Sequence, residues 1–246
     1  MQNLALKSPA PPTDAVDAAD RDAVLARYRR YRALSREHNN RMVAALSADT
    51  LLKQARRLGL ASGRTLVAED IDELFLAFDL AIHTAPPDRT RVIDRYARSA
   101  KPDPGSDDER VIEAMRRARF TLVRVERRHE TAGLIVHDMS RAADLWLMDE
   151  QLQVSANGKT MLATRLFDFD DFHITAGVIV PVDGDLLRAV LLHVPFLASR
   201  PGPLVVTDRR FAEAVYRVAL EDGIMSGVGY RDVDDGEGDK PASSAP

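Results

Sequence analysis

Apolar and polar residues alternate in twos between Phe120 and Val182, and this is the longest part of the chain with that period. A period of two is typical of β-strands, whose successive side chains point to opposite faces. The alternation is clearest at 172–181, where His173 and Thr175 stand between apolar residues. The turn signal Asn157-Gly158 is suited to positive φ. The strands predicted from this pattern are 119–127, 132–139, 144–149, 160–168 and 172–181.

The remaining segments carry apolar residues at the three-and-four spacing of helices. At 68–83, acidic residues stand at the start, where the helix dipole favours negative charge, and the later part is apolar almost all round. We therefore expect this helix to be buried and to pack on the β module. Residues 204–206 are expected to be extended, and Asp107 and Asp108 are expected to cap the helix that follows them. The predicted helices are 18–46, 47–58, 68–83, 88–97, 109–117, 185–193 and 207–223.

These elements predict an α+β protein with an N-terminal helical part, a small five-stranded antiparallel β barrel or curled sheet, and closing helices. The Pro- and Gly-containing stretch at 100–108 is predicted to be a linker between the helical region and the β module, which we expect to form one compact body. The two ends are rich in Pro, Gly, Ala, Ser and Asp, which is typical of disorder. The predicted division is a disordered tail at 1–16, a helical region at 17–99, the linker, a β module with closing helices at 109–223 and a disordered tail at 224–246.

Composition narrows the classes of function. The chain has 246 residues, a net charge of −4 and no cysteine. The lack of cysteine excludes disulfides, thiolate nucleophiles and cysteine zinc sites, and it fits a reducing cytoplasm. The first residues lack the apolar core of a signal peptide, and no run approaches the roughly 20 apolar residues of a membrane span. We therefore expect a cytoplasmic protein without a membrane partner.

Two histidines of the β module, His137 and His173, are the candidate metal ligands. They become neighbours if their strands pair in a suitable register, and with nearby carboxylates they would suit a metal-dependent hydrolase. The adjacent His137-Asp138 pair argues the other way, because neighbouring strand residues point to opposite faces. His129 falls in a charged hairpin loop and reads as exposed to solvent. The acidic cluster at 168–171 could hold a divalent cation, but a solvated turn explains it more simply.

An arginine-rich stretch at 27–32 lies within the first predicted helix and mixes basic with aromatic residues, as RNA-binding segments do. Helical spacing places Tyr28 and Tyr31 on the core face with Val24, so the arginines point outward. Acidic residues dilute the patch, and a solvated helix face with ion pairs is the competing interpretation. The candidate nucleic-acid-binding residues are Arg27, Arg29, Arg30, Arg32, Arg56 and Arg57.

Motifs for other chemistries are missing from the sequence. It contains neither a Gly-rich phosphate loop nor a G-x-S-x-G serine, so nothing indicates a nucleotide cofactor or a serine hydrolase. Trp146, between two leucines, is typical of a core anchor. We expect no cofactor and no catalytic residue.

The order of segments resembles a group of uncharacterised bacterial proteins, some of which carry a C-terminal SEC-C zinc tail. The resemblance covers residues 46 to 223. The SEC-C tail needs cysteines, and this chain has none, so its zinc and partner binding do not transfer. The matching segments are Thr65–Val67, Ala68–His83, Arg119–Val125, Val136–Met139, Leu147–Glu150, Leu162–Leu166, Phe172–Gly177 and Pro181.

The sequence therefore favours a cytoplasmic, non-enzymatic binding or regulatory protein with an unknown protein partner. The first alternative is nucleic-acid association through the arginine-rich helix, and the second is a metal-dependent hydrolase. The pattern leaves the ligand, the oligomeric state and the biological process open.

Overall fold

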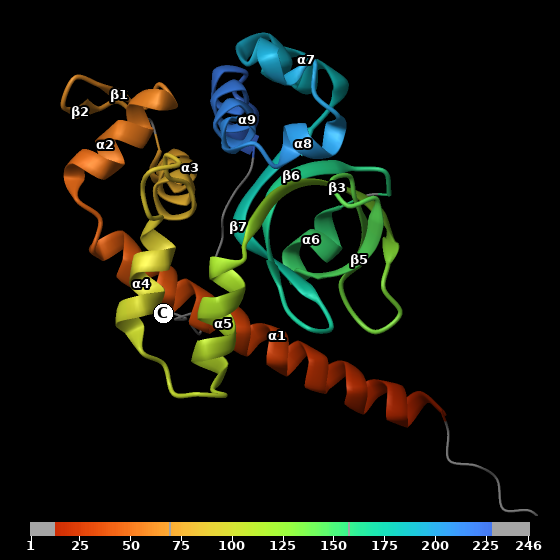
Figure 1. Cartoon of the computed structure of the whole chain (residues 1–246). Coiled ribbons are helices and arrows are strands. Elements are labelled where there is room, and N and C mark those ends of the chain that lie inside the picture. The colour runs from red at the N-terminus through yellow and green to blue at the C-terminus, as the bar shows by residue number, and fades with distance from the viewer. Residues whose placement is uncertain (1–12, 69, 157, 228–246) are drawn as a thin grey trace, which may run out of the picture.

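Five strands between Arg119 and Val182 form one sheet, which we call the β module (Figure 1). The computed structural model describes residues 13–227 except 69 and 157. The strand order is β3-β4-β5-β7-β6, and β6 also pairs with β3, so that the pairing runs full circle. The strands are β3 (Arg119–Arg128), β4 (Leu134–Asp138), β5 (Ala143–Met148), β6 (Met161–Asp168) and β7 (His173–Val182).

The α+β class and the positions of the five strands are confirmed, but the expected all-antiparallel pairing is wrong at one place. β5 and β7 run parallel, with Leu147 opposite His173 and Met148 opposite Ile174. Parallel neighbours need a crossover of a dozen or more residues, and the helix α6 together with β6 supplies it. Turn signals show antiparallel hairpins, but they carry no information on a pairing between strands so far apart in the chain.

Alternation along the strands divides their side chains between the inside and the outside of the β module. Leucines and valines from β3, β4, β5 and β6 meet inside. Leu152 of α6 (Glu150–Ser155) joins them, and Figure 1 shows this short helix within the ring of strands. Asp149 caps α6 by accepting from the backbone of Leu152, and it also accepts from the Thr175 hydroxyl at 2.9 Å. The helix is therefore fixed to β7 from inside.

The helices form two groups, and each group shares a hydrophobic cluster with residues on the outside of the β module. Tyr28 and Tyr31 of α1 are buried, as predicted, against a cluster that includes Phe172 and Ile174. Leu76 and Leu80 of α3 pack in a second cluster with outward residues of β3 and β7, which confirms that this helix packs on the β module. The first group is α1 (Thr13–Ala44), α4 (Val92–Ala100) and α5 (Asp107–Arg116). The second group is α2 (Ala48–Arg57), α3 (Ile71–His83), α7 (Gly184–His193), η1 (Pro195–Leu197), α8 (Gly202–Val206), α9 (Arg209–Glu221) and η2 (Ile224–Gly227).

Local signals place most helix starts correctly. Ser47 and Asp208 cap α2 and α9, because their side-chain oxygens accept from free backbone N–H groups. The cap of α5 is Ser106 and not the aspartates after it, which lie inside the first turn. Residues 204–206 are helical and not extended, because Pro201 and Pro203 start the short helix α8. α6 was not predicted at all.

Three further predictions fall partly outside the described residues. The tail expected at 1–16 lies outside them up to residue 12, and α1 begins at Thr13. The tail expected at 224–246 begins with η2 and lies outside them from residue 228. Asn157 of the predicted turn also lies outside them.

Residues 65–66 form the extended pair β2, which joins β1 (Ala61–Ser62) in a small hairpin.

Candidate functional site

A cleft of about 550 Å³ lies where α1, α4 and α5 meet the turn between β6 and β7. One wall is α5, the floor comes from α1 and from aromatic residues, and the opposite wall is the turn at 168–172. The cleft thus combines side chains from the helical part and from the β module. Pockets of this size suit small organic ligands.

The floor of the cleft is aromatic. Tyr31 of α1 stacks on Phe169 of the turn, with ring centroids 4.6 Å apart and planes 25° apart. Phe172 lies beneath, 5.8 Å from Phe169 and 6.2 Å from Tyr31. The Arg27 guanidinium sits 5.0 Å from the centre of the Phe172 ring and forms an ion pair with Asp171. This arrangement offers a flat apolar surface edged by charge.

The α5 wall carries arginines because the helix places residues three and four apart on one face. Arg110, Arg116 and Arg117 line the cleft together with Glu113. Arg116 holds Glu113 at 2.8 Å, whereas Arg117 is 3.6 Å from the same side chain. A hydrogen bond and the charge of Tyr31 are the main causes that raise the pKa of Arg110, and Asp107 and Asp170 add to them.

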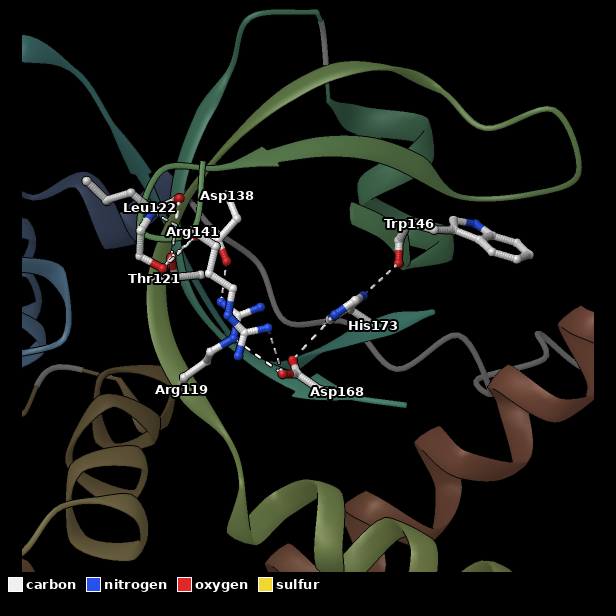
Figure 2. A network of polar contacts seen from close by, with 9 residues as sticks. Arg119, Thr121, Leu122, Asp138, Arg141, Trp146, Asp168 and His173 are labelled. Carbon is white, nitrogen blue, oxygen red and sulfur yellow. Dashed lines mark hydrogen bonds and ion pairs between the residues drawn. The ribbon is translucent and has the colours of Figure 1, made fainter. Parts of the chain in front are cut away.

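Behind the turn, Asp168 joins the cleft to a polar network at one end of the β module (Figure 2). Its Oδ2 atom is 3.4 Å from Arg119 and 3.4 Å from Arg141, and its Oδ1 atom is 3.5 Å from Nε2 of His173. Arg119 also pairs with Asp138. One carboxylate is therefore surrounded by two guanidinium groups and an imidazole.

Asp138 is the fully buried acid of this network. It accepts from the Thr121 hydroxyl at 2.7 Å, and from the backbone N–H and the hydroxyl of Ser140 at 2.8 and 2.7 Å. Burial raises the pKa of Asp138, but these hydrogen bonds and the charge of Arg119 outweigh it, so the pKa lies below its ordinary value. Asp138 is thus a charged structural anchor that fixes Arg119.

His173 lies between two acceptors, as Figure 2 shows. Its Nδ1 atom is 3.3 Å from the Trp146 carbonyl oxygen, and its Nε2 atom faces Asp168. Burial lowers the pKa of His173, although the charge of Asp168 opposes this effect. A neutral imidazole has one N–H and can satisfy only one of these acceptors. The arginines contact Oδ2 of Asp168, whereas its buried Oδ1 atom has no hydrogen-bond partner among the described residues.

The structure does not bring His137 and His173 together. His137 of β4 faces Arg124 and Asp144 on its two neighbouring strands and contacts Asp144 at 2.8 Å. β5 lies between β4 and β7, which separates the two histidines. Asp138 and His137 point to opposite faces, as the strand pattern predicts. Within the described ranges, no group of three or more His, Asp or Glu side chains is arranged to hold a metal ion.

His129 also departs from its prediction. It stacks on the indole of Trp146, with centroids 3.9 Å apart and planes 9° apart. The indole N–H donates to the Ala132 carbonyl at 2.6 Å. The hairpin histidine is therefore a packing partner of the single tryptophan and not a free loop residue.

All six candidate nucleic-acid-binding arginines contact groups within the chain. Four of them, on α1, face acidic residues of the β module, α5 and α6, so they hold α1 against the rest of the protein. Arg56 donates to the Gly63 carbonyl at 2.7 Å. The remaining pairs are Arg27–Asp171, Arg29–Glu150 at 2.6 Å, Arg30–Asp107 at 2.6 Å, Arg32–Asp149 at 3.9 Å and Arg57–Glu213 at 3.1 Å.

Sequence reasoning missed the cleft, although it noticed one of its walls. The prediction of a solvated turn at 168–171 holds for the exposed Asp170 and Asp171. Asp168 is instead held by arginines. The signal that remained unused is Phe169, an aromatic residue between acids, because a wholly solvated turn has no need of a phenylalanine.

Comparison with known proteins places the chain in a family. Residues 22–226 match the model of a family of unknown function (DUF7986), and the chain belongs to this family. The matched part contains the whole β module and the described helices, apart from the first nine residues of α1 and the last residue of η2. No curated protein and no solved structure matches the chain. None of the helices in the described part has the length and apolar character to cross a membrane.

Proposed function

We propose that the protein is a non-enzymatic binding protein whose ligand occupies the cleft between α5 and the β6–β7 turn. The observation that carries this proposal is the cleft itself, with an aromatic floor and charged walls that come from three separate parts of the chain. Concave sites with an apolar surface and a few convergent polar groups are the usual form of a ligand site. The residues that line the cleft come together only when the chain folds, because they are far apart in the sequence.

Binding is favoured over catalysis because two of the three aspartates that line the cleft are held in ion pairs. Asp168 is held by Arg119 and Arg141, and Asp171 by Arg27. A carboxylate held in place by guanidinium groups is not free to approach a substrate as a proton shuttle. We further propose that the β module is a small closed barrel that serves as a rigid support for the turn, since its strand pairing runs full circle.

A thermal-shift screen tests the proposal. Amino acids, nucleotides, organic acids, sugar phosphates and polyamines are added separately to the wild-type protein, to Phe169→Ala and to Phe75→Ala. Phe75 is an exposed phenylalanine of α3 outside the cleft, and it serves as the matched control. A ligand at about 100 times its Kd stabilises by about 2.7 kcal/mol, which raises the Tm of a chain of this size by roughly 5–10 °C.

The expected result is one compound class that stabilises the wild type and Phe75→Ala but not Phe169→Ala. Compounds that stabilise all three proteins equally bind elsewhere, and that outcome rejects the cleft. A panel in which no class raises the Tm of the wild type also counts against the proposal.

The two alternatives have less support from the geometry. The arginines of α1 are the basis of the nucleic-acid alternative, and they are paired with acids of the same chain. The histidines of the hydrolase alternative lie on strands that do not pair. Filter binding to RNA and DNA at two salt concentrations tests the first alternative, because phosphate contacts weaken steeply with salt.

A further inference from the structure

The charged side chains of the cleft that lack a close partner differ between its helix side and its turn side. The α5 side contributes Arg110, Arg116 and the C-cap Arg117 together with Glu109 and Glu113, but Glu113 is paired with Arg116 and Glu109 accepts from the Gly105 N–H. The β6–β7 turn contributes the anionic Asp168, Asp170 and Asp171. Because these side chains belong to two different walls, a molecule in the cleft can meet arginines from the α5 side and acids from the turn. The aromatic pair of Tyr31 and Phe169 lies between them.

On the cationic wall, Arg110 and Arg117 are the side chains with bonding capacity left. Asp107 is 3.6 Å from Arg110, but it is held more closely by Arg30 at 2.6 Å. Glu113 is likewise 3.6 Å from Arg117 and is held by Arg116 at 2.8 Å. A separation of 3.6 Å is too long for a hydrogen bond. A guanidinium carries five N–H groups, so both arginines keep N–H groups for a ligand carboxylate, even though Arg110 also bonds Tyr31.

On the anionic wall, Asp170 is the available acid. Asp171 is taken by Arg27, and Asp168 by Arg119 and Arg141. Asp170 is exposed and forms no ion pair with any residue that the structure describes. Its charge is one of the causes that raise the pKa of Arg110, so Asp170 and Arg110 lie near each other in the cleft.

We propose that the cleft binds a small zwitterion with an aromatic ring, of which a free aromatic α-amino acid is the simplest case. The ligand carboxylate contacts Arg110 and Arg117, its ammonium group contacts Asp170, and its ring lies against Phe169. This inference rests on the proposed function, because it assigns a ligand class to the same cleft.

A ligand with only one charged group pairs with the charged residues of one wall and leaves those of the other wall without a partner. An anion without an ammonium group meets Asp170 as a like charge, and a cation without a carboxylate meets Arg110 in the same way. A zwitterion offers a carboxylate to the arginines and an ammonium group to Asp170, and it leaves the net charge of the site unchanged. Specificity of this kind arises from repulsion of the wrong ligands as much as from attraction of the right one.

Calorimetric titration of the full chain with four probes tests the ligand class. L-Phenylalanine carries all three groups, phenethylamine lacks the carboxylate, 3-phenylpropionate lacks the ammonium group and L-alanine lacks the ring. We expect L-phenylalanine to bind about tenfold more tightly than each of the other three, because each omitted group removes one charge-assisted or stacking contact.

Two variants assign the walls. Arg110→Gln is expected to bring phenylalanine down to the affinity of phenethylamine, and Asp170→Asn to bring it down to the affinity of phenylpropionate. The matched controls are Arg188→Gln and Asp185→Asn, which change an exposed ion pair of α7 away from the cleft and should leave all four affinities unchanged.

The results separate the ligand class from the proposed function. If the analogues bind as tightly as phenylalanine, or if both cleft variants weaken all probes equally, the zwitterion is rejected. Binding of another class that is lost in Phe169→Ala would then still leave the cleft as a binding site. Failure of the four probes together with failure of the whole compound panel rejects both proposals.

Discussion

The Asp79 carboxylate of α3 accepts two hydrogen bonds from the Arg165 guanidinium of β6, at 2.8 and 2.9 Å, and both side chains are buried. The Tyr216 hydroxyl of α9 donates to the same carboxylate at 3.0 Å. Burial raises the pKa of Asp79, but Arg165 and Tyr216 outweigh it, so that the pKa lies below its ordinary value. Three elements from distant parts of the chain thus share one charged group.

We expect Asp79→Asn to destabilise the protein by about 3–5 kcal/mol, because it leaves the Arg165 charge buried without a counterion. Asp94→Asn is the matched control. Arg91 binds Asp94 with the same two distances, 2.8 and 2.9 Å, but that pair is partly exposed and is worth at most about 1 kcal/mol. Urea unfolding curves measure both values. Equal losses in the two variants would show that burial does not set the cost.

His83, one turn after Asp79 on α3, predicts a pH dependence of stability. Burial and the nearby Arg165 charge lower the pKa of His83 from 6.5 to about 3, although Asp79 opposes them. Below pH 6.5 the unfolded chain protonates His83, whereas the folded protein keeps it neutral down to about pH 3. The free energy of unfolding therefore decreases as the pH falls from 6.5 towards 3. Between pH 7 and pH 5 the expected loss is about 2 kcal/mol.

Comparison of variants isolates this histidine from the acids that titrate in the same range. His83→Phe keeps a ring beside Phe167 and should lose about 2 kcal/mol less than the wild type between pH 7 and pH 5. His193→Phe changes a histidine on the surface of α7 and should keep the wild-type loss. Urea unfolding at the two pH values gives the comparison. A His83→Phe protein with the full loss would mean that His83 is not the group responsible.

Alanine substitutions at Gly133 and Gly59 distinguish the stability cost of a steric clash from the cost of backbone strain. Their φ angles are 77° and 79°, a region that side chains disfavour. A Cβ atom at Gly133 would lie 2.4 Å from the Leu147 carbonyl oxygen, whereas one at Gly59 would meet nothing within 4 Å. Gly59→Ala should therefore cost about 1–2 kcal/mol and Gly133→Ala about 1–3 kcal/mol more. Equal urea midpoints for the two variants would contradict the close approach of β4 and β5.

The sequence predicts the local elements of this fold well because their causes are local. Alternation in twos places all five strands within two residues of their observed starts, and side-chain caps such as Ser47 place the helices. α6 escaped prediction because six residues make fewer than two turns and show no clear period. The prediction of an extended segment at 204–206 is wrong because it follows from the strand preference of the β-branched valines, whereas the segment is helical.

The site was harder to predict because it depends on contacts between distant residues. Nothing at 168–171 indicates that the arginines of α5 lie opposite, more than 50 positions away. The stripe of arginines on α1 looks free in the sequence because its acidic partners lie far along the chain. One usable signal was overlooked, namely Asp79. An acid within an apolar helix predicts a buried counterion, and Arg165 in a hydrophobic strand is its natural partner.

Trp146, the single tryptophan, provides a direct reporter of the β module because it stacks on His129. Burial lowers the pKa of His129, although Glu130 opposes it. Protonation puts a cation against the indole ring, and the imidazolium quenches its emission. We expect tryptophan fluorescence to fall on acidification with a midpoint below pH 6.5, the ordinary value for histidine. His129→Phe should abolish this titration. His173→Gln, at the histidine that faces the Trp146 carbonyl, should retain it, and the reverse pattern would assign the quenching to His173.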